Sequence, residues 1–452
     1  MVCFRAGHVL QHRIPPVKKT LIALSLSSLA FASSISTAHA QSADAEQRLA
    51  KAQPKVIEWR RHLHQNPELG NREFETAKYI TAHLKSLGME VETGIAHTGV
   101  VALLKGGKPG PTVALRADMD ALPVTEQVDI PFASKAKTEY NGEQVGVMHA
   151  CGHDTHVAML MGAAQVLAEM REELAGNVLF IFQPAEEGAP DGEEGGAELM
   201  LKEGLFKKYK PDVAFGQHVT SSLPVGVIGY RSGPLMASSD EFRINVKGRQ
   251  THGSRPWGGV DPITAAAQIV MGTQTLVSRQ IDITKEPAVV SYGVIDGGIR
   301  NNIIPDSVYL NGTIRNFDMD NRQEIFKRLK VTAEKIAESS GATAEVEILE
   351  GYPVTVNNPE LTAAAIPTLK AAAGDKNVMV IPKITGAEDF SFFANEVPGF
   401  YYFLGVTPKG TNPATAPSNH SPRFYVDESA LAVGTRALTQ LALDYFERQE
   451  NQ

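Results

Sequence analysis

Two short polar stretches constrain this chain more than any other feature. Residues 148–156 (MHACGHDTH) hold three His, one Cys and one Asp within nine residues, and residues 183–188 (QPAEEG) set two glutamates side by side. Thiolate, imidazole and carboxylate groups suit a transition metal such as Zn²⁺ or Mn²⁺. Cys151 and His153 are two positions apart and would point to different sides of a helix, so they can meet at one ion only from a turn. The sequence therefore predicts a metal site built on a turn.

An apolar run follows this turn and predicts a helix over residues 155–174. Asp is favoured at a helix N-cap, so we expect Asp154 to cap this helix. A thiolate close to a helix N-terminus is stabilised by the helix dipole, and we expect this effect at Cys151.

The first 40 residues have the pattern of a secretory signal peptide. A pair of lysines precedes an apolar run over residues 21–35, and an Ala-x-Ala site ends at Ala40. Cleavage there would leave a mature chain that begins at Gln41 and is exported to a periplasm, with no membrane attachment. The alternative is a retained membrane anchor, but the run is short for a span, and no later stretch is long and apolar enough.

Cysteine usage supports a metal-ligand role for Cys151. The only other cysteine, Cys3, falls in the segment that we expect to be removed. A lone Cys in an exported protein is a buried filler, a reactive thiol or a ligand. The neighbouring histidines favour the ligand, and we expect His149 and His156 to support the turn by hydrogen bonds rather than to bind metal.

Charge and composition narrow the class of protein. The 452-residue chain is 43% hydrophobic and 21% charged, as ordinary soluble proteins are, and it is long enough for two domains with separate cores. Its net charge is −8, and removal of the four basic residues before position 41 takes it to −12. An acidic body without a basic cluster argues against a nucleic acid as the main partner.

Strands and helices alternate through the first half of the chain. Residues 111–118, 177–182 and 212–215 are apolar runs typical of buried strands, separated by helical patterns. This alternation predicts an α/β fold with a mainly parallel sheet. The three strands lead to polar groups at Asp118 and Asp120, at Glu186 and Glu187, and at His218. Because ligands bind beyond the carboxyl ends of parallel strands, one site is expected there.

A different pattern occupies residues 239–351. Four strand patterns and two helical patterns follow one another in the order β-α-β-β-α-β, and Asp261 is expected to cap the first helix. This order is the ferredoxin-like split βαβ arrangement. We therefore expect that, after the signal peptide (1–40), a first domain in two parts (41–238 and 352–452) is interrupted by an inserted domain (239–351).

Ten motifs, taken together and in order, resemble those of the co-catalytic metallopeptidase family of aminoacylases and carboxypeptidase G-type enzymes. They cover nearly all of the mature chain: WRRHLHQNPELG, ALRADMDALP, MHACGHDTH, QPAEEG, GQHV, THGSRPWGGVDP, RNNIIPD, GTIR, GAEDFSFF and NHSPRF. The branch is similar to that of hippurate hydrolases and plant auxin–amino acid conjugate hydrolases. The resemblance implies a two-metal catalytic domain and an inserted domain through which two chains form a homodimer.

The resemblance also implies which residues bind metal. The implied ligands are Cys151, His153, Glu187, His218 and His420. The two divalent ions would be Mn²⁺, Zn²⁺, Co²⁺ or Ni²⁺, among which the sequence does not choose. Relatives outside this branch have a metal-binding His at the position of Asp118, so we do not assign Asp118 as a ligand.

Five further residues receive roles by the same resemblance. Glu186 is implied as the general acid/base and Asp120 as the carboxylate that orients a metal ligand. His252 resembles the His that a partner subunit donates to the substrate oxyanion. Asn302 and Arg315 resemble contacts to the carboxylate of a small-molecule substrate.

These roles predict hydrolysis of the amide bond in an N-acyl amino acid or a similar, hippurate-like conjugate. Glu186 would take a proton from the attacking water and deliver it to the leaving nitrogen. Within enzymes, the alternative is a dipeptidase or aminopeptidase with the same metals, which would need an anchor for a free α-amine. A non-catalytic solute- or metal-binding protein would not need Glu186, and a thiol redox enzyme would need a resolving partner for Cys151.

Overall fold

The computed structural model describes residues 23–451 of the chain, and the side chains of residues 44–451. Two compact units divide the chain, Met1–Arg48 and Leu49–Gln452. The expected signal peptide, residues 1–40, therefore lies largely outside this description: residues 1–22 are not described, and only the backbone is described for residues 23–40. Among the described residues, no helix has the length and apolar character of a membrane span.

An eight-stranded sheet forms the frame of the second unit, in the order β1-β2-β6-β3-β7-β18-β8-β17. The central strands β6, β3, β7 and β18 are parallel to one another. The pairs β1–β2, β2–β6 and β18–β8 are antiparallel, and β17 is parallel to β8. The strand bounds are β1 Glu90–Ile95, β2 Gly99–Lys105, β3 Lys108–Asp118, β6 Ala175–Gln183, β7 Val213–Pro224, β8 Ile228–Tyr230, β17 Val378–Val380 and β18 Gly399–Thr407. The predicted α/β fold with a mainly parallel sheet is confirmed.

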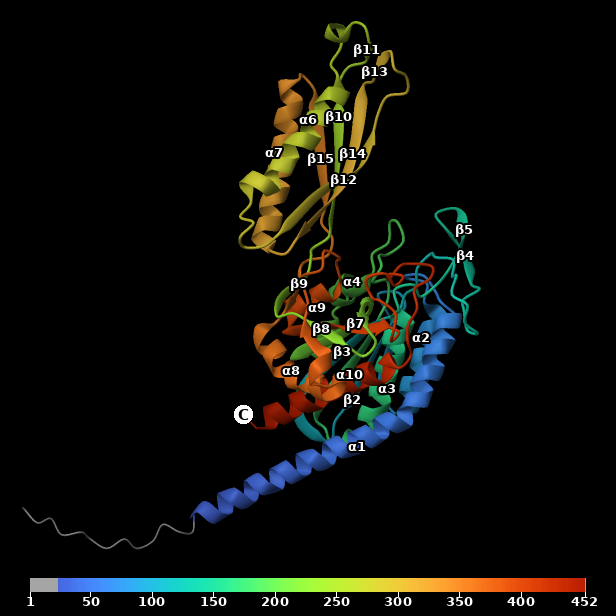
Figure 1. Cartoon of the computed structure of the whole chain (residues 1–452), viewed down its shortest axis with the longest axis vertical. Helices are drawn as coiled ribbons and strands as arrows, with labels where there is room; N and C mark the ends of the chain where they lie inside the picture. Colours follow the sequence, from blue (N-terminus) through green and yellow to red (C-terminus); the bar gives the residue numbers. More distant parts are fainter. Residues whose placement is uncertain (1–22, 452) are drawn as a thin grey trace, which may run out of the picture. The chain divides into compact units, whose positions relative to one another are not determined.

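Helices cover both faces of this sheet (Figure 1), which explains why the central strands contain continuous buried apolar runs, residues 113–115 in β3 and 178–182 in β6. On one face, α3 (His153–Glu169) and α10 (Ala430–Glu450) pack against the sheet, with α8 (Pro359–Ala373) against α10. On the other, α4 (Gly196–Lys202), α5 (Leu205–Tyr209) and α9 (Phe390–Glu396) share a core with β6, β7 and β18. Beside α3 lie α2 (Phe74–Ser86) and the end of α1 (Ala23–Gln65).

The N-cap predicted for α3 is wrong. Gly152, with φ of 100°, occupies the cap position, and Asp154 lies inside the first turn, fully buried. Gly is required there because the left-handed backbone disfavours a Cβ, which would also lie 2.4 Å from the Val219 side chain. The Asp154 carboxylate instead accepts hydrogen bonds from Arg60 at 2.8 Å and His64 at 2.9 Å.

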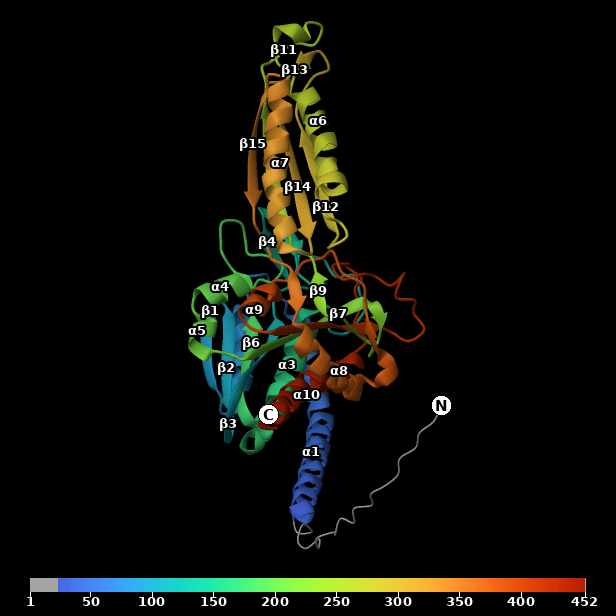
Figure 2. The same ribbon diagram turned by 90° about the vertical axis from the view of Figure 1, so that its left-hand side faces the viewer.

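A four-stranded antiparallel sheet follows in the chain, in the order β12-β14-β10-β15. Helices α6 and α7 lie along one face of this sheet (Figures 1 and 2). Its elements are β10 Asp240–Lys247, α6 Pro262–Thr275, β12 Ala288–Asp296, β14 Ser307–Asn316, α7 Met319–Ser339 and β15 Thr343–Leu349. Along β10, Phe242, Ile244 and Val246 are buried and alternate with exposed or partly exposed residues. The predicted ferredoxin-like arrangement is confirmed.

Several short elements were not predicted. A hairpin of β4 (Lys137–Tyr140) and β5 (Glu143–Gly146) stands apart from the main sheet, and β11 (Thr251–His252) pairs with β13 (Ile303–Ile304) in the second sheet's connections. The two chain segments that connect the sheets pair as β9 (Gly233–Met236) and β16 (Thr355–Asn357). Strands this short carry too few residues for a periodic pattern to reveal them.

Candidate metal centre

The five expected ligands come from separate elements of the eight-stranded fold. Cys151 precedes α3 and His153 is its first residue, Glu187 follows β6, His218 lies within β7, and His420 lies in the loop between β18 and α10. Because β3 and β6 are parallel, with Asp118 opposite Gln183, the segments after both strands meet at one edge. The structure therefore brings all five side chains together.

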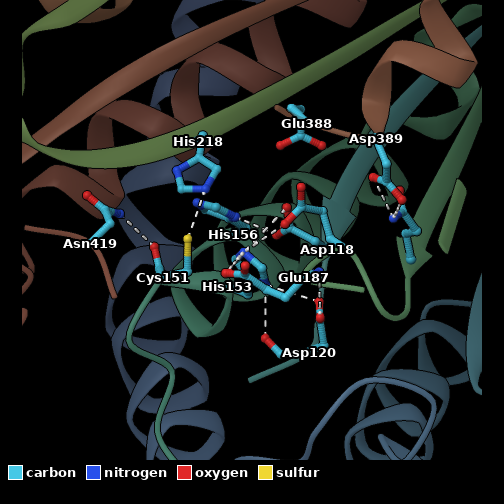
Figure 3. Close-up of polar contacts among 12 residues, drawn as sticks. Asp118, Asp120, Cys151, His153, His156, Glu187, His218, Glu388, Asp389 and Asn419 are labelled. Atoms are coloured by element: carbon cyan, nitrogen blue, oxygen red, sulfur yellow. Dashed lines mark hydrogen bonds and ion pairs between the residues drawn. The ribbon is translucent and has the colours of Figure 1, made fainter. Parts of the chain in front are cut away.

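Distances show two overlapping groups that share Cys151. Its Sγ lies 3.3 Å from Nε2 of His218 and 3.3 Å from Nε2 of His420. Oε1 of Glu187 lies 3.0 Å from Nε2 of His420 and 3.9 Å from Nε2 of His153. Cys151, His153 and His218 form one group with the spacing to hold an ion, and Cys151, Glu187 and His420 form a second. Figure 3 shows four of these side chains pointing toward one another.

Hydrogen bonding and charge both fit cations at this centre. Nε2 of His153 is buried and has no hydrogen-bond partner among the described residues. Three buried carboxylates, those of Asp118, Glu388 and Asp389, pair with the buried guanidinium of Arg116. Three more, those of Asp120, Glu186 and Glu187, lie within 4 Å of the His153 ring and are largely buried. Uncompensated buried charge is strongly destabilising. A set of sulfur, imidazole and carboxylate donors in such a place suits divalent transition metals.

The state of Cys151 depends on such a cation. Burial, together with the Glu187 and Glu186 carboxylates, raises the pKa of its thiol well above the usual range. The expectation that the helix dipole favours a thiolate is therefore wrong for the protein groups alone, because burial and the carboxylates outweigh the dipole. A metal ion bound to the sulfur reverses this balance.

Asp120 makes hydrogen bonds to two of the expected ligands, and His156 makes hydrogen bonds beside them. Nδ1 of His153 donates to the Asp120 carbonyl at 2.9 Å and faces the Asp120 carboxylate at 3.2 Å, which leaves Nε2 toward the centre. The other carboxylate oxygen of Asp120 accepts from the Glu187 N–H at 3.0 Å. His156 is hydrogen-bonded at both ring nitrogens, to Asp118 and to a backbone N–H of β7, as expected for a supporting residue.

His149 behaves differently from His156. Both of its ring nitrogens are buried and lack a hydrogen-bond partner among the described residues. Burial lowers its pKa to about 4, so the ring is neutral near pH 7. The expectation that His149 supports the turn by hydrogen bonds is therefore wrong.

The sequence interpretation missed a buried ionic network behind the ligands. Arg116 contacts Asp118 at 2.7 Å, Glu388 at 2.9 Å and Asp389 at 2.9 Å. Burial opposes ionisation of Asp118, but Arg116 and two histidines outweigh it and hold its pKa well below the usual range. An arginine in the middle of an apolar strand (ALRAD) and the adjacent acids of GAEDFSFF were the available signals, because each needs a buried partner.

The surroundings of the two adjacent glutamates shift their pKa values in opposite directions. Burial opposes ionisation of Glu187, but His420 and His153 outweigh it and lower its pKa. Burial raises the pKa of Glu186 well above the usual range, and Glu388 and Glu187 raise it further. Oε2 of Glu186 lies 3.9 Å from Nε2 of His153. Neighbouring carboxylates whose pKa values are pushed apart are typical of a ligand and a proton carrier.

A cavity of about 740 Å³ opens onto this centre. Glu186 and four of the expected ligands (Cys151, Glu187, His218 and His420) line it, and one wall is apolar, formed by Leu223, Met236, Ile381, Ile384 and Phe403. Arg315, near the end of β14 and partly buried, lines the same cavity. A cavity of this size, lined by apolar side chains together with polar and charged ones, suits a small molecule.

His252 and Asn302 do not line this cavity. They lie together on the connections of the second sheet, where His252 pairs with Ile303 and the Gly253 N–H donates to the Asn302 carbonyl at 2.8 Å. Both side chains are exposed. The structure thus brings Arg315 to the centre and separates it from Asn302 within one chain.

Several known proteins are similar to this chain in sequence and fold. The sequence pattern of peptidase family M20/M25/M40 matches residues 114–444. Thermostable carboxypeptidase 2 of Saccharolobus solfataricus is 43% identical over 392 residues, 86% of this chain and 95% of the relative. IAA-amino acid hydrolase ILR1-like 4 of Arabidopsis thaliana is 37% identical over 390 residues, 85% of this chain and 84% of the relative. The structure of the Bacillus subtilis YXEP protein, a dinuclear metal-binding peptidase of the M20 family, superposes with a TM-score of 0.73 at 36% identity, over 88% of this chain and 99% of that one.

Proposed function

Because the chain belongs to peptidase family M20/M25/M40 and is a metal-dependent amidohydrolase or metallopeptidase, we propose that it hydrolyses the amide bond of N-acyl amino acids or related, hippurate-like conjugates. One observation carries the proposal: a candidate base, Glu186, and a candidate carboxylate anchor, Arg315, line the same cavity as the metal-ligand groups. Among known relatives, the hydrolase of IAA-amino acids supports this class of substrate.

Each residue has a defined part in the proposed reaction. Two divalent ions, of Mn²⁺, Zn²⁺, Co²⁺ or Ni²⁺, would be held by Cys151, His153, Glu187, His218 and His420, and when bound they supply positive charge that acidifies a water and polarises the carbonyl. Glu186 takes a proton from the attacking water and then gives it to the leaving nitrogen. Arg315 holds the substrate carboxylate by charge-assisted hydrogen bonds.

The rival function is a dipeptidase or aminopeptidase. It requires a group in the cavity that is free to bind an α-ammonium. Three carboxylates line the cavity, and Glu186 and Glu187 lie within 4 Å of His153 in the metal-ligand groups. The third, Glu388, already accepts from Arg116 and from the Tyr401 hydroxyl at 2.5 Å. This arrangement favours an acylated nitrogen over a free amine.

A substrate panel tests the proposal. Metal-reconstituted protein is assayed with N-acyl amino acids and with dipeptides that have the same leaving residue, and each is offered with a free and with an amidated carboxylate. We expect higher kcat/KM for the N-acyl free acids, because they place the carboxylate at Arg315 without an amine in the cavity. Faster hydrolysis of the dipeptides would favour the rival function, and equal rates on free and amidated substrates would refute the role of Arg315.

The oligomeric state forms part of the proposal. His252 and Asn302 are exposed and distant from the cavity lining of their own chain, so they can act on a substrate only if a second chain supplies them. Exposed apolar side chains gather on the same domain, among them Trp257, Met271, Ile295 and Ile299. Exposed apolar groups in such number are typical of protein interfaces. We therefore expect a homodimer through residues 239–351, which light scattering of the mature protein would measure.

Export is a separate proposal that rests on the sequence of residues 1–40. The mature protein should begin at Gln41 and be recovered from the periplasm. Mass spectrometry of the exported protein checks this, and an intact leader would contradict it.

A further inference from the structure

The segment that presents Glu186 has an unusual backbone. Ala185 has φ of 50°, in the left-handed region that residues with a Cβ rarely adopt, and Gly188 follows with φ of 105°. The turn is also closely packed: a Cβ at Gly70 would lie 3.2 Å from the Cα of Ala185. Such a conformation persists only where surrounding contacts impose it.

Three side chains from three elements bind consecutive backbone groups of this turn. Glu73, just before α2, accepts from the Ala185 N–H at 2.9 Å. Asp120, just after β3, accepts from the Glu187 N–H at 3.0 Å. The hydroxyl of Tyr352 donates to the carbonyl of Glu186 at 2.7 Å. The backbone on both sides of the candidate base is therefore held from outside.

Tyr352 differs from the other two because it also belongs to the connection between the sheets. Its carbonyl accepts from the Ser239 N–H at 3.0 Å, which joins the outgoing and returning segments. The preceding residue, Gly351, donates to Asp240 at 3.1 Å, and Asp240 is paired with Arg322 of α7. The backbone of Tyr352 is thus tied to the inserted domain while its side chain holds Glu186.

The ring of Tyr352 is fixed as well. It packs edge-on against Phe392 of α9, with ring centroids 6.1 Å apart, and it lines the same cavity as Glu186 and Arg315. Arg315 lies on the inserted domain and Glu186 on the catalytic domain, so Tyr352 lies at the link between the two.

We propose that Tyr352 is a positioning residue, whose phenol imposes the strained turn at residues 185–187 and keeps Glu186 in register with the domain that carries Arg315. The proposal rests on the general-base role of Glu186 in the proposed function. It predicts that loss of one hydroxyl affects proton transfer more than substrate binding or metal binding, because the ring, the ligands and Arg315 all remain.

Kinetics of Tyr352→Phe give the first test, on the best substrate of the panel. We expect kcat to fall about tenfold, with KM and metal content changed less than about twofold. In a Glu186→Gln background, the same substitution should cause no further loss, since its effect passes through Glu186. Tyr292→Phe is the matched control: it removes a partly buried phenol hydroxyl that contacts Thr273 in the inserted domain, away from the cavity.

Hydrogen exchange gives a second test that needs no activity. In Tyr352→Phe, the amides of residues 185 and 187 should exchange faster than in the unchanged protein, and in Tyr292→Phe they should not. Unchanged exchange, an unchanged kcat, or a loss of the same size in the Glu186→Gln background would each overturn the proposal. Absence of hydrolysis of every N-acyl amino acid would instead refute the proposed function, while exchange at residues 185–187 would still decide the role of Tyr352.

Discussion

The candidate site residues lie in two regions that differ in burial: the metal centre and the connections of the second sheet that carry His252. At the centre, His153 is fully buried and Cys151 nearly so, and the groups around them make contacts with partners far away in the chain. His252 and Asn302 are exposed, and within the described residues the ring of His252 is hydrogen-bonded to its near neighbour Ser254. A site that is organised within one chain needs such buried partners. Residues that act only in a dimer can be exposed in the single chain, because the second chain would bury them.

The largest effects are expected in the buried region, from substitutions of Glu186 and Glu187, to which we assign different roles. Glu186→Gln keeps the size of the side chain but removes the base, so kcat should fall by about 10²–10⁴-fold with metal content unchanged. Glu187→Gln and Cys151→Ser should instead lose metal, and excess ion should restore part of the activity. Metal analysis and kcat on the three variants measure this difference.

Glu194→Gln, an exposed glutamate of the same loop, serves as the control and should change neither quantity. If Glu186→Gln loses metal and Glu187→Gln retains it, the two roles are reversed. Full activity with full metal content in Glu186→Gln would rule out the mechanism.

The next largest effect is expected from His252, in the exposed region. His252→Ala should lower kcat by about 10²–10³-fold, the range found for loss of an oxyanion donor. Mixed with Glu186→Gln chains, it should recover activity, because one cavity of each mixed dimer then has both an intact base and an intact donor. Activity of purified mixed dimers is the measurement, and each variant alone is the control. No recovery would show that the exposed residues do not complete a neighbour's centre.

Arg315 lies between the two regions and should show an intermediate effect. Loss of a charge-assisted hydrogen bond is worth about 1.5–3 kcal/mol, so Arg315→Ala should raise KM by about 10- to 100-fold with little change in kcat. Amidated substrates, which lack the charge, should be almost insensitive. Arg243→Ala, on an exposed position of β10, is the matched control. A loss confined to kcat would place Arg315 in the chemical step rather than in binding.

The smallest effect is expected from His64, a buried residue behind the metal centre. His64 is buried between Asp154 and Glu126, near Arg60 and His149; burial disfavours its cation, but the two carboxylates outweigh this and raise its pKa. The stabilisation is complete below the unfolded-state pKa of about 6.5 and is lost as the pH rises through the higher folded-state pKa.

The Tm should therefore fall by a few degrees as the pH is raised above about 6.5, and His64→Gln should remove this part of the pH dependence. Thermal unfolding of metal-loaded protein across this range measures it. His62→Gln, exposed on the same helix, is the control. An unchanged pH profile in His64→Gln would show that the cation contributes nothing to stability.

Local patterns predicted the structure well where local contacts decide it. The predicted N-cap Asp261 accepts from the N–H groups of Ile263 and Thr264, on a helix that begins near the surface. The same reasoning failed at Asp154, because Arg60, which is 94 positions away, contacts its carboxylate. His149 and His156 stand in one motif and look equivalent, yet only His156 meets a partner, Asp118. A contact between residues that are far apart in the chain cannot be predicted from the local sequence around either of them.

The sequence by itself determined the donor types of the metal centre, the turn that carries Cys151 and His153, the parallel core strands and the split βαβ order of the inserted segment. These follow from residue chemistry and from periodic burial, which are local properties. Only the tertiary structure decided that Arg116 and Glu388 lie behind the ligands, that Arg315 lines the cavity while His252 and Asn302 do not, and that Tyr352 holds the Glu186 backbone. These contacts depend on which residues, distant in sequence, are buried together. Burial in turn shifts the pKa values of these residues and restricts their positions.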